Sequence, residues 1–227
     1  MKKYLALGLT LVLALPLLTA CGGNSEGNTN SGGGSTSVPS KTPAKQDIPA
    51  RVVEVPDKLL DLSDNSIYYV IIDGVKFNLL EVTIKDFLDA GFTINKDKDY
   101  NENTSVDAKQ SFGSLFSCDL YKEGSRKYFS VTPVNLSDKS VPLKDCEISG
   151  IQFDERIGSE FDIATVCNLS YGCKEEEVKS VFGESHGSTN NYLSYSERKM
   201  LAGKMFDFQC SNGTVAIVRI YTDKSPY

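Results

Sequence analysis

Tryptophan is absent from the 227-residue sequence, and histidine occurs once, as His186. His186 stands in the polar segment GESHGSTNN, and the chain has no nucleophile elbow of the kind found in hydrolases. We therefore predict a solvent-exposed loop histidine and no catalytic residue. The alternative, a hydrolase with His186 as its general base, needs a nearby nucleophile and an orienting carboxylate.

Motifs for metals and phosphates are missing as well. The sequence has no glycine-rich phosphate loop, and Asp97-Lys98-Asp99 does not continue into a calcium-loop pattern. Zinc sites use cysteines about two to four residues apart, whereas a longer spacer separates Cys167 from Cys173. We expect no cofactor and no metal.

Clusters of basic residues are also lacking. The chain has 24 Lys and Arg against 30 Asp and Glu, a net charge of −6 and a pI near 4.9. Nucleic-acid binding needs clustered Lys and Arg to neutralise phosphates, and the same groups draw a domain to an anionic membrane surface. The composition therefore argues against both partners.

After Leu18 the chain has no apolar run of the length that spans a bilayer, about 20 residues. The one long apolar run, Tyr4 to Leu18, follows Met1-Lys2-Lys3 and precedes the small residues Thr19-Ala20. This order is typical of a secretory signal peptide over residues 1–20. Its shortness and Pro16 argue against a permanent membrane helix.

Leu18-Thr19-Ala20-Cys21 resembles the lipobox of bacterial lipoproteins. In that family the cysteine thiol receives a diacylglyceryl group and becomes the first residue of the mature chain. The resemblance implies cleavage between Ala20 and Cys21, lipidation of Cys21, and a place on the outer, extracytoplasmic face of the cell membrane. Two acyl chains hold a domain at a bilayer where one would be marginal. The alternative is a plain secreted protein.

Residues 21–50 are rich in Gly, Ser, Asn, Thr and Pro and hold almost no large apolar side chain. Such a segment cannot bury enough surface to offset its ordering entropy, so we expect a disordered tether. As a flexible coil it has a typical end-to-end distance of about 30 Å.

Two hairpins are predicted in the remaining residues. Asp73-Gly74 and Asn212-Gly213 each separate two strand-like runs, as in type I′ turns. In the first hairpin we expect Ile72 opposite Val75 and Val70 opposite Phe77. In the second we expect Cys210 opposite Val215 and Phe208 opposite Ile217, with Asp207 and Gln209 on the other face. Pro133 indicates that its strand lies at an edge or contains a bulge.

Two short helices are predicted between the strands. One begins after Thr83 and stops at Gly91, and the other has Glu175 to Glu177 in its first turn and stops at Gly183. We therefore predict an α+β fold, with short helices packed on antiparallel sheet. We place a first module over 51–160 and a second over 161–227.

The order DGVKFNL, TIKDFLDAGFTI, CEISGIQF, GCKEEEVKSVFGES and FDFQCSNGTVAIVRIY resembles uncharacterised lipoproteins of Gram-positive bacteria. More distantly, it is similar to the tandem α/β modules of β-lactamase-inhibitor-like proteins. The resemblance spans most of residues 66 to 222 and implies a non-catalytic, protein-binding surface.

Five cysteines remain after Cys21: Cys118, Cys146, Cys167, Cys173 and Cys210. An extracytoplasmic location permits disulfides, and Cys167 with Cys173 would close a small loop. Many other pairings are open, and an anaerobic source would keep all the thiols reduced. Cys118, Cys146 and Cys210 alternate with apolar residues, which indicates small buried side chains.

Tyrosine offers contact area with a polar tip. We expect some of the tyrosines to line a binding face or to lie half-buried on sheets: Tyr68, Tyr69, Tyr192, Tyr195 and Tyr221. The sequence thus predicts a membrane-anchored lipoprotein that binds a protein or envelope component without catalysis. The alternative is a solute-binding lipoprotein that delivers a small molecule to a transporter.

Overall fold

A computed structural model describes residues 51–224 except 96–97, 158–159, 190 and 198–202. The predicted signal peptide, Cys21 and the tether lie outside these residues. The described part belongs to one compact unit, Lys45–Tyr227. Among its helices, none is long and apolar enough to cross a membrane.

Antiparallel strands dominate the structure, with 39% strand against 14% helix. The predicted α+β fold class is therefore wrong, and the chain is mostly β. The two α-helices of the described residues hold only six and eight residues. They are too short to cover the main sheet, and a second small sheet supplies part of the layer that consists of helices in the predicted fold.

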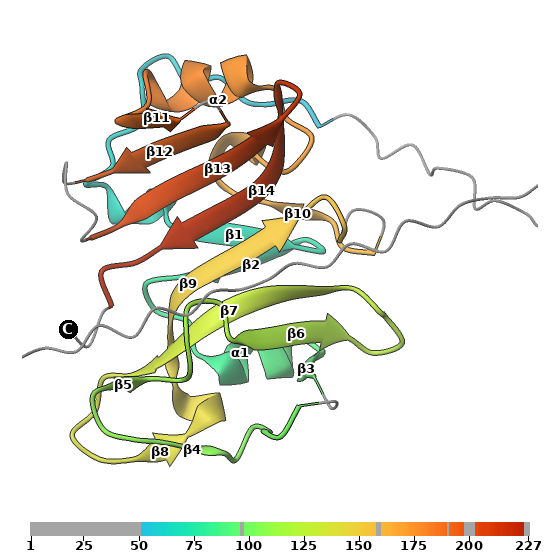
Figure 1. The fold of residues 1–227 in the computed structure, drawn as a ribbon, viewed down its shortest axis with the longest axis vertical. Coiled ribbons are helices and arrows are strands. Elements are labelled where there is room, and N and C mark those ends of the chain that lie inside the picture. The colour runs from blue at the N-terminus through green and yellow to red at the C-terminus, as the bar shows by residue number, and fades with distance from the viewer. Residues whose placement is uncertain (1–50, 96–97, 158–159, 190, 198–202, 225–227) are drawn as a thin grey trace, which may run out of the picture. The chain divides into compact units, whose positions relative to one another are not determined.

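The main sheet has nine strands, in the order β11-β12-β13-β14-β9-β7-β6-β3 with β5 paired to β7 (Figure 1). Its strands are β3 (Phe92–Ile94), β5 (Gln110–Ser111), β6 (Cys118–Lys122), β7 (Tyr128–Asn135), β9 (Glu147–Asp154), β11 (Gly187–Thr189), β12 (Tyr192–Ser196), β13 (Met205–Ser211) and β14 (Thr214–Tyr221). All neighbouring pairs are antiparallel. The sheet continues across residue 160, since β9 pairs with β14; the division into two modules stays a prediction.

A three-stranded sheet has the order β10-β1-β2, and β4 pairs with β8. These elements are β1 (Tyr69–Ile72), β2 (Val75–Asn78), β4 (Ser105–Val106), β8 (Val141–Pro142), β10 (Ile163–Ala164) and the 3-10 turns η1 (Asn65–Ile67), η2 (Leu143–Asp145) and η3 (Val166–Asn168). The structure confirms both pairs predicted for the first hairpin, Ile72 with Val75 and Val70 with Phe77.

The second hairpin contains a bulge that the sequence did not reveal. Cys210 faces Val215 as predicted, but Phe208 faces Val218, so the predicted partner Ile217 is wrong. The register shifts between Gln209 and Cys210, which leaves an extra residue in β14. The shift turns Val218 toward the core and Ile217 to the opposite face.

Pro133 lies in β7, which pairs with β6 on one side and β9 on the other. The register of β7 against β9 shifts between Thr132 and Pro133. The predicted bulge is therefore confirmed, whereas the edge position is wrong. The bulge gives proline a place inside the sheet without a ladder donor.

The helices begin and end near the predicted residues. Helix α1 (Ile84–Asp89) follows Thr83, whose backbone N–H donates to the Asp86 carboxylate at 2.7 Å. Helix α2 (Glu175–Phe182) has three glutamates in its first turn and ends at Gly183, whose φ is 85°. Glycine tolerates this left-handed conformation, so it stops the helix.

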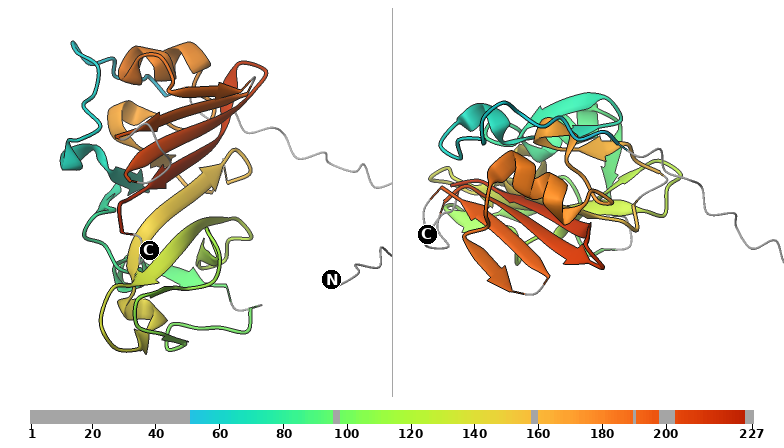
Figure 2. Two further views of the ribbon diagram at one scale, coloured as in Figure 1. Left: turned by 60° about the vertical axis from the view of Figure 1, so that its left-hand side comes forward. Right: turned by 90° about the horizontal axis from the view of Figure 1, so that it is seen from above.

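Aromatic side chains fill the core on one side of the main sheet. Phe182 of α2 stacks on Tyr195 at 4.9 Å between ring centroids and packs against Phe206 at 5.0 Å. Phe87 of α1 lies 4.3 Å from Phe77 and 5.7 Å from Phe129. Figure 2 shows both helices and the β10-β1-β2 sheet on this side. The opposite side of the main sheet, which we call the open face, carries neither.

Candidate functional site on the open face of the sheet

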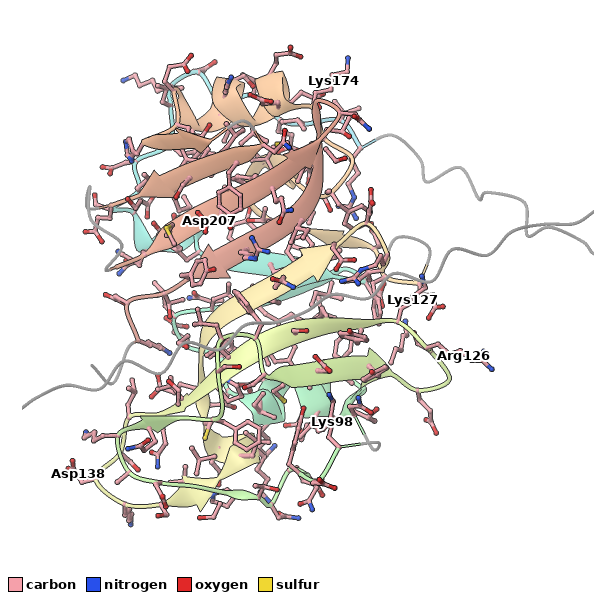
Figure 3. The ribbon with its side chains drawn as sticks, in the orientation of Figure 1. Lys98, Arg126, Lys127, Asp138, Lys174 and Asp207 are labelled. Atoms are coloured by element: carbon pink, nitrogen blue, oxygen red, sulfur yellow. The ribbon has the colours of Figure 1, made fainter. Side chains whose placement is uncertain are left out.

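A row of polar side chains crosses the open face from strand to strand. Each member pairs directly with the next, and this polar row consists of Ser194, Asp207, Arg219, Gln152, Ser130 and Asp119. Directly opposed residues project from the same face of a sheet. The row spans six strands, which is about 24 Å at about 4.8 Å between neighbouring strands. Figure 3 labels Asp207 on this face.

The row follows from strand alternation. In β13, Phe206 and Phe208 point into the core, so Asp207 between them points out, as the sequence predicted. In β9, Ile151 and Phe153 are buried and Gln152 lies between them. Each strand thus contributes one polar side chain at the same level.

Arg219 is held by acceptors from three neighbouring strands. Its Nε donates to Gln152 Oε1 at 2.7 Å, and its Nη1 donates to the Tyr192 hydroxyl. Its Nη2 lies 3.4 Å from Gln209 Oε1. The guanidinium also lies 5.7 Å from the centroid of the Tyr192 ring, within cation–π range. The guanidinium is therefore fixed in orientation while the side chain stays half-buried.

Asp207 is buried beneath its neighbours, with 5% of its surface exposed. The Tyr192 hydroxyl lies 3.5 Å from Asp207 Oδ2, a long hydrogen bond. Asp207 Oδ1 is buried and has no hydrogen-bond partner among the described residues. Burial raises the pKa of Asp207 above its ordinary value, and this effect outweighs the Ser194 hydroxyl and Arg219, which lower it.

Aromatic rings flank the polar row at the side of Tyr221. Phe116 lies 5.4 Å from Tyr221 between ring centroids, and its N–H donates to Thr132 Oγ1 at 2.7 Å. A Cβ placed on Gly150 would lie 3.3 Å from the Phe116 ring. Glycine at this position therefore lets the Phe116 loop lie close to the sheet.

The other flank has rings as well. Tyr192 and Ile217 both pair with Gln209, in the line of residues next to the polar row. Tyr121 packs against Tyr128 with 5.2 Å between their ring centroids. At the far end of the polar row, Ser130 Oγ donates to Asp119 Oδ1 at 2.8 Å. The face thus combines a hydrogen-bonding centre with rings along both sides.

The predicted tyrosines divide between this face and the interior. Tyr192 and Tyr221 lie half-buried on the open face, whereas Tyr68 and Tyr195 are fully buried in the core. Tyr69 lies half-buried on β1 with the Lys76 ammonium 3.8 Å from its ring centroid. Sequence reasoning found two members of the face and placed Asp207 and Gln209 correctly, but it missed Arg219 and Gln152.

The predicted disulfide is not formed in the structure. All five described cysteines are free; Cys173 is buried, and Cys167 is half-buried. Cys118, Cys146 and Cys210 are buried, as their alternation with apolar residues predicts. Burial raises the pKa of the Cys118 and Cys146 thiols to about 12. Such thiols are poor nucleophiles.

His186 is exposed, as predicted, and its Nδ1 lies 3.4 Å from the backbone nitrogen of Ser196. Within the described ranges, no group of three or more His, Cys, Asp or Glu could hold a metal ion. The predicted lipidation site Cys21 and cleavage site Ala20 lie outside those ranges.

An open hollow of about 520 Å³ lies beside β3. Its lining residues are Leu88, Thr93, Ile94, Asn95, Lys98, Asp99, Tyr100, Asn101 and Glu102. Lys98 is labelled in Figure 3. Residues 96–97, which interrupt this lining, are not among the described residues, so the polar row gives the better-defined site.

Comparisons with protein-family models, with curated proteins and with solved structures found no match. The resemblances to Gram-positive lipoproteins and to β-lactamase-inhibitor-like modules therefore stay predictions. The function has to be inferred from the open face and from the N-terminal sequence.

Proposed function

We propose that this chain is a lipoprotein held by Cys21 on the outer face of a bacterial cell membrane, and that its β domain binds a protein or envelope component without catalysis. The open face of the main sheet is the observation that carries the binding role. It presents a fixed hydrogen-bonding row between aromatic rings, and no helix of the described chain covers it.

The chemistry of this face supports binding over catalysis. Arg219 and Asp207 both contact the Tyr192 hydroxyl, and Arg219 also donates to Gln152 and Gln209. The nucleophiles that could serve an acyl-transfer or redox enzyme, the thiols of the described cysteines, have their pKa values raised by burial. Neither these charged side chains nor the thiols are therefore suited to act as catalytic groups.

The first described residues lie on the side of the domain opposite the open face (Figure 2). Glu54 N–H donates to Cys167 O at 3.0 Å, and Asn168 Nδ2 donates to Glu54 Oε1 at 3.0 Å. These contacts hold the first described residues against η3, on the side of the helices and the small sheet (Figure 2). A tether over residues 21–50 would therefore join the domain on its covered side.

The proposal has two separate tests. Mass spectrometry of natively extracted protein should find diacylglyceryl on an N-terminal Cys21, and a Cys21→Ala variant should be shed into the medium. An unmodified N terminus, or equal shedding by both chains, would refute the anchor. Mild crosslinking followed by affinity isolation should enrich a specific envelope component, and loss of that component in Arg219→Gln would place it on the open face.

The alternative, delivery of a small molecule to a transporter, is favoured by the hollow beside β3. Its volume of about 520 Å³ lies within the usual range of ligand pockets. A metabolite panel that raises the melting temperature of the full chain would support this function, because ligand binding stabilises the native state by mass action. We expect no such rise.

A further inference from the structure

We propose that the polar row binds a neutral, hydroxyl-rich chain, that is, a linear polysaccharide of the cell envelope laid across the strands. This inference rests on the proposed function and names the ligand class of the same face. It follows from the mixture of hydrogen-bonding groups, their charge, their fixed geometry and the position of the rings.

The row and the adjoining Gln209 mix donors with acceptors. Arg219 supplies donors, the amides of Gln152 and Gln209 supply both kinds, and Ser194 supplies a hydroxyl. Sugar hydroxyls donate and accept at once, so they match such a mixture. An anion would be served by donors alone and a cation by acceptors alone.

The charges point to the same class. Arg219 lies directly opposite Asp207 in the register, so a positive and a negative group adjoin at the centre of the row. The whole chain carries a net charge of −6, which repels polyanions at long range. The row as a whole holds two carboxylates, Asp207 and Asp119, against one guanidinium, so it too disfavours a polyanion, whereas an uncharged ligand meets no such repulsion.

The geometry of the row is set before a ligand arrives. Arg219 is oriented by Gln152, Tyr192 and Gln209, so little side-chain entropy is left to lose on binding. Asp207, with 5% of its surface exposed, keeps Oδ1 without a donor among the described residues. An unsatisfied buried carboxylate destabilises the fold and is typical of a functional site.

The placement of the rings favours a polysaccharide over a protein partner. Protein interfaces put apolar and aromatic anchors at the centre and polar groups at the rim. Here the centre is polar, while Tyr192 lies on one side and Tyr221 with Phe116 on the other. Rings at the margins offer faces to the C–H groups of sugars whose hydroxyls point into the row. A length of about 24 Å suits several linked units.

The test is calorimetric titration of the full processed chain in detergent with neutral linear hexasaccharides: cellohexaose, laminarihexaose, maltohexaose, mannohexaose and chitohexaose. The neutral polysaccharide fraction from the producing cells and polygalacturonate complete the panel. We expect binding to a neutral glycan, weaker binding to its disaccharide, and no binding to polygalacturonate. Arg219→Gln should weaken binding by about tenfold or more, as expected for a lost charge-assisted hydrogen bond.

The matched control is Arg126→Gln, which makes the same change at an exposed turn residue away from the row (Figure 3). It should bind as the wild type does. Tyr192→Phe, which keeps the ring and removes the hydroxyl next to Arg219 and Asp207, covers the case in which Arg219→Gln fails to fold. It should also weaken binding.

Two results would overturn the inference. The first is no binding to any neutral glycan of the panel, with or without binding to polygalacturonate, and the second is neutral-glycan binding that both face variants leave unchanged. If, in addition, crosslinking captures a protein that depends on Arg219, the proposed function survives and only the ligand class is wrong. If crosslinking also captures nothing, both fail.

Discussion

Asp207 is a carboxyl group that its surroundings disfavour as an ion. Its folded-state pKa is raised above the unfolded value because burial outweighs the Ser194 hydroxyl, Arg219 and Tyr192. The protonated form therefore stabilises the fold at pH below the unfolded pKa, and this stability is lost as pH rises through the folded pKa. At neutral pH the ionised Asp207 carboxylate therefore destabilises the folded state.

Asp207→Asn should raise the free energy of unfolding by about 1 kcal/mol at pH 7, because it removes a buried ion and supplies a donor. The gain should shrink as pH falls into the range where Asp207 itself is protonated. Urea unfolding at several pH values measures both effects. Asp138→Asn is the matched control, since the Asp138 side chain is 95% exposed and should change stability by less than about 0.5 kcal/mol. A destabilised Asp207→Asn would contradict the electrostatic assignment.

The cysteines differ in how accessible their thiols are. Cys167 is half-buried, whereas the pKa values of Cys118 and Cys146 are raised to about 12 in the core. Iodoacetamide at pH 8 should therefore alkylate Cys167 first and reach Cys118 and Cys146 only after unfolding. Peptide mass spectrometry without reductant reads out each site. A linked Cys167–Cys173 peptide would instead establish the disulfide predicted from the sequence.

At the scale of elements, the end of α2 depends on Gly183. Its φ of 85° is unfavourable for other residues, and a Cβ there would lie 2.9 Å from Leu59 Cδ1. Gly183 combines φ 85° with ψ −156°, a region that is essentially restricted to glycine. Gly183→Ala should therefore lower the free energy of unfolding by about 1 to 3 kcal/mol from backbone conformation, and by more from the contact with Leu59.

Gly124→Ala is the matched control for this prediction, because Gly124 has a φ of 81° and no atom within 4 Å of its added Cβ. Gly124→Ala should show the cost of a side chain at positive φ without a steric contact. Adding Leu59→Ala to Gly183→Ala should recover part of the difference between the two glycine variants, after correction for Leu59→Ala by itself. Equal losses at Gly183 and Gly124 would show that the contact with Leu59 is unimportant.

Features set by neighbours in the chain could be predicted from the sequence. Asp73-Gly74 and Asn212-Gly213 fix turns, and Gly91 and Gly183 stop helices, because each acts through its own backbone angles. The bulge in β14 could not be predicted, since nothing local distinguishes a strand that gains a residue opposite Gln209. The fold class could not be predicted for a related reason. The two short helical patterns are complete within the local sequence, whereas the number of strands that join one sheet depends on contacts between distant segments.

The candidate site shows the same limit. Alternation placed Asp207 on the outward face, but Arg219 meets Gln152 across 67 residues of sequence, and only strand order brings them together. One sequence pattern does mark the members of the polar row. Single polar residues interrupt apolar runs at Gln152, Asp207 and Arg219, each between two buried side chains.

At the scale of the whole molecule, the proposed anchor, tether and domain have distinct physical roles. The lipid on Cys21 would retain the chain, and the tether would hold the domain about 30 Å from the headgroups. The first described residues meet the domain on its covered side, which leaves the open face directed away from that junction. The acidic net charge of −6 would keep the domain from adhering to anionic lipid.

Salt dependence tests whether the ligand of the open face is neutral. Affinity for the bound neutral hexasaccharide should change by less than about twofold between roughly 50 and 500 mM NaCl, because no counterions are released. A polyanion that makes one ionic contact with the protein would lose about five- to eightfold in affinity over this range of salt concentration. Arg219→Lys adds a second measure, since lysine keeps the charge but loses the planar fork. A neutral glycan should bind Arg219→Lys more weakly than wild type at every salt concentration. If Arg219→Lys keeps its affinity and binding depends steeply on salt concentration, the open face recognises its ligand by charge.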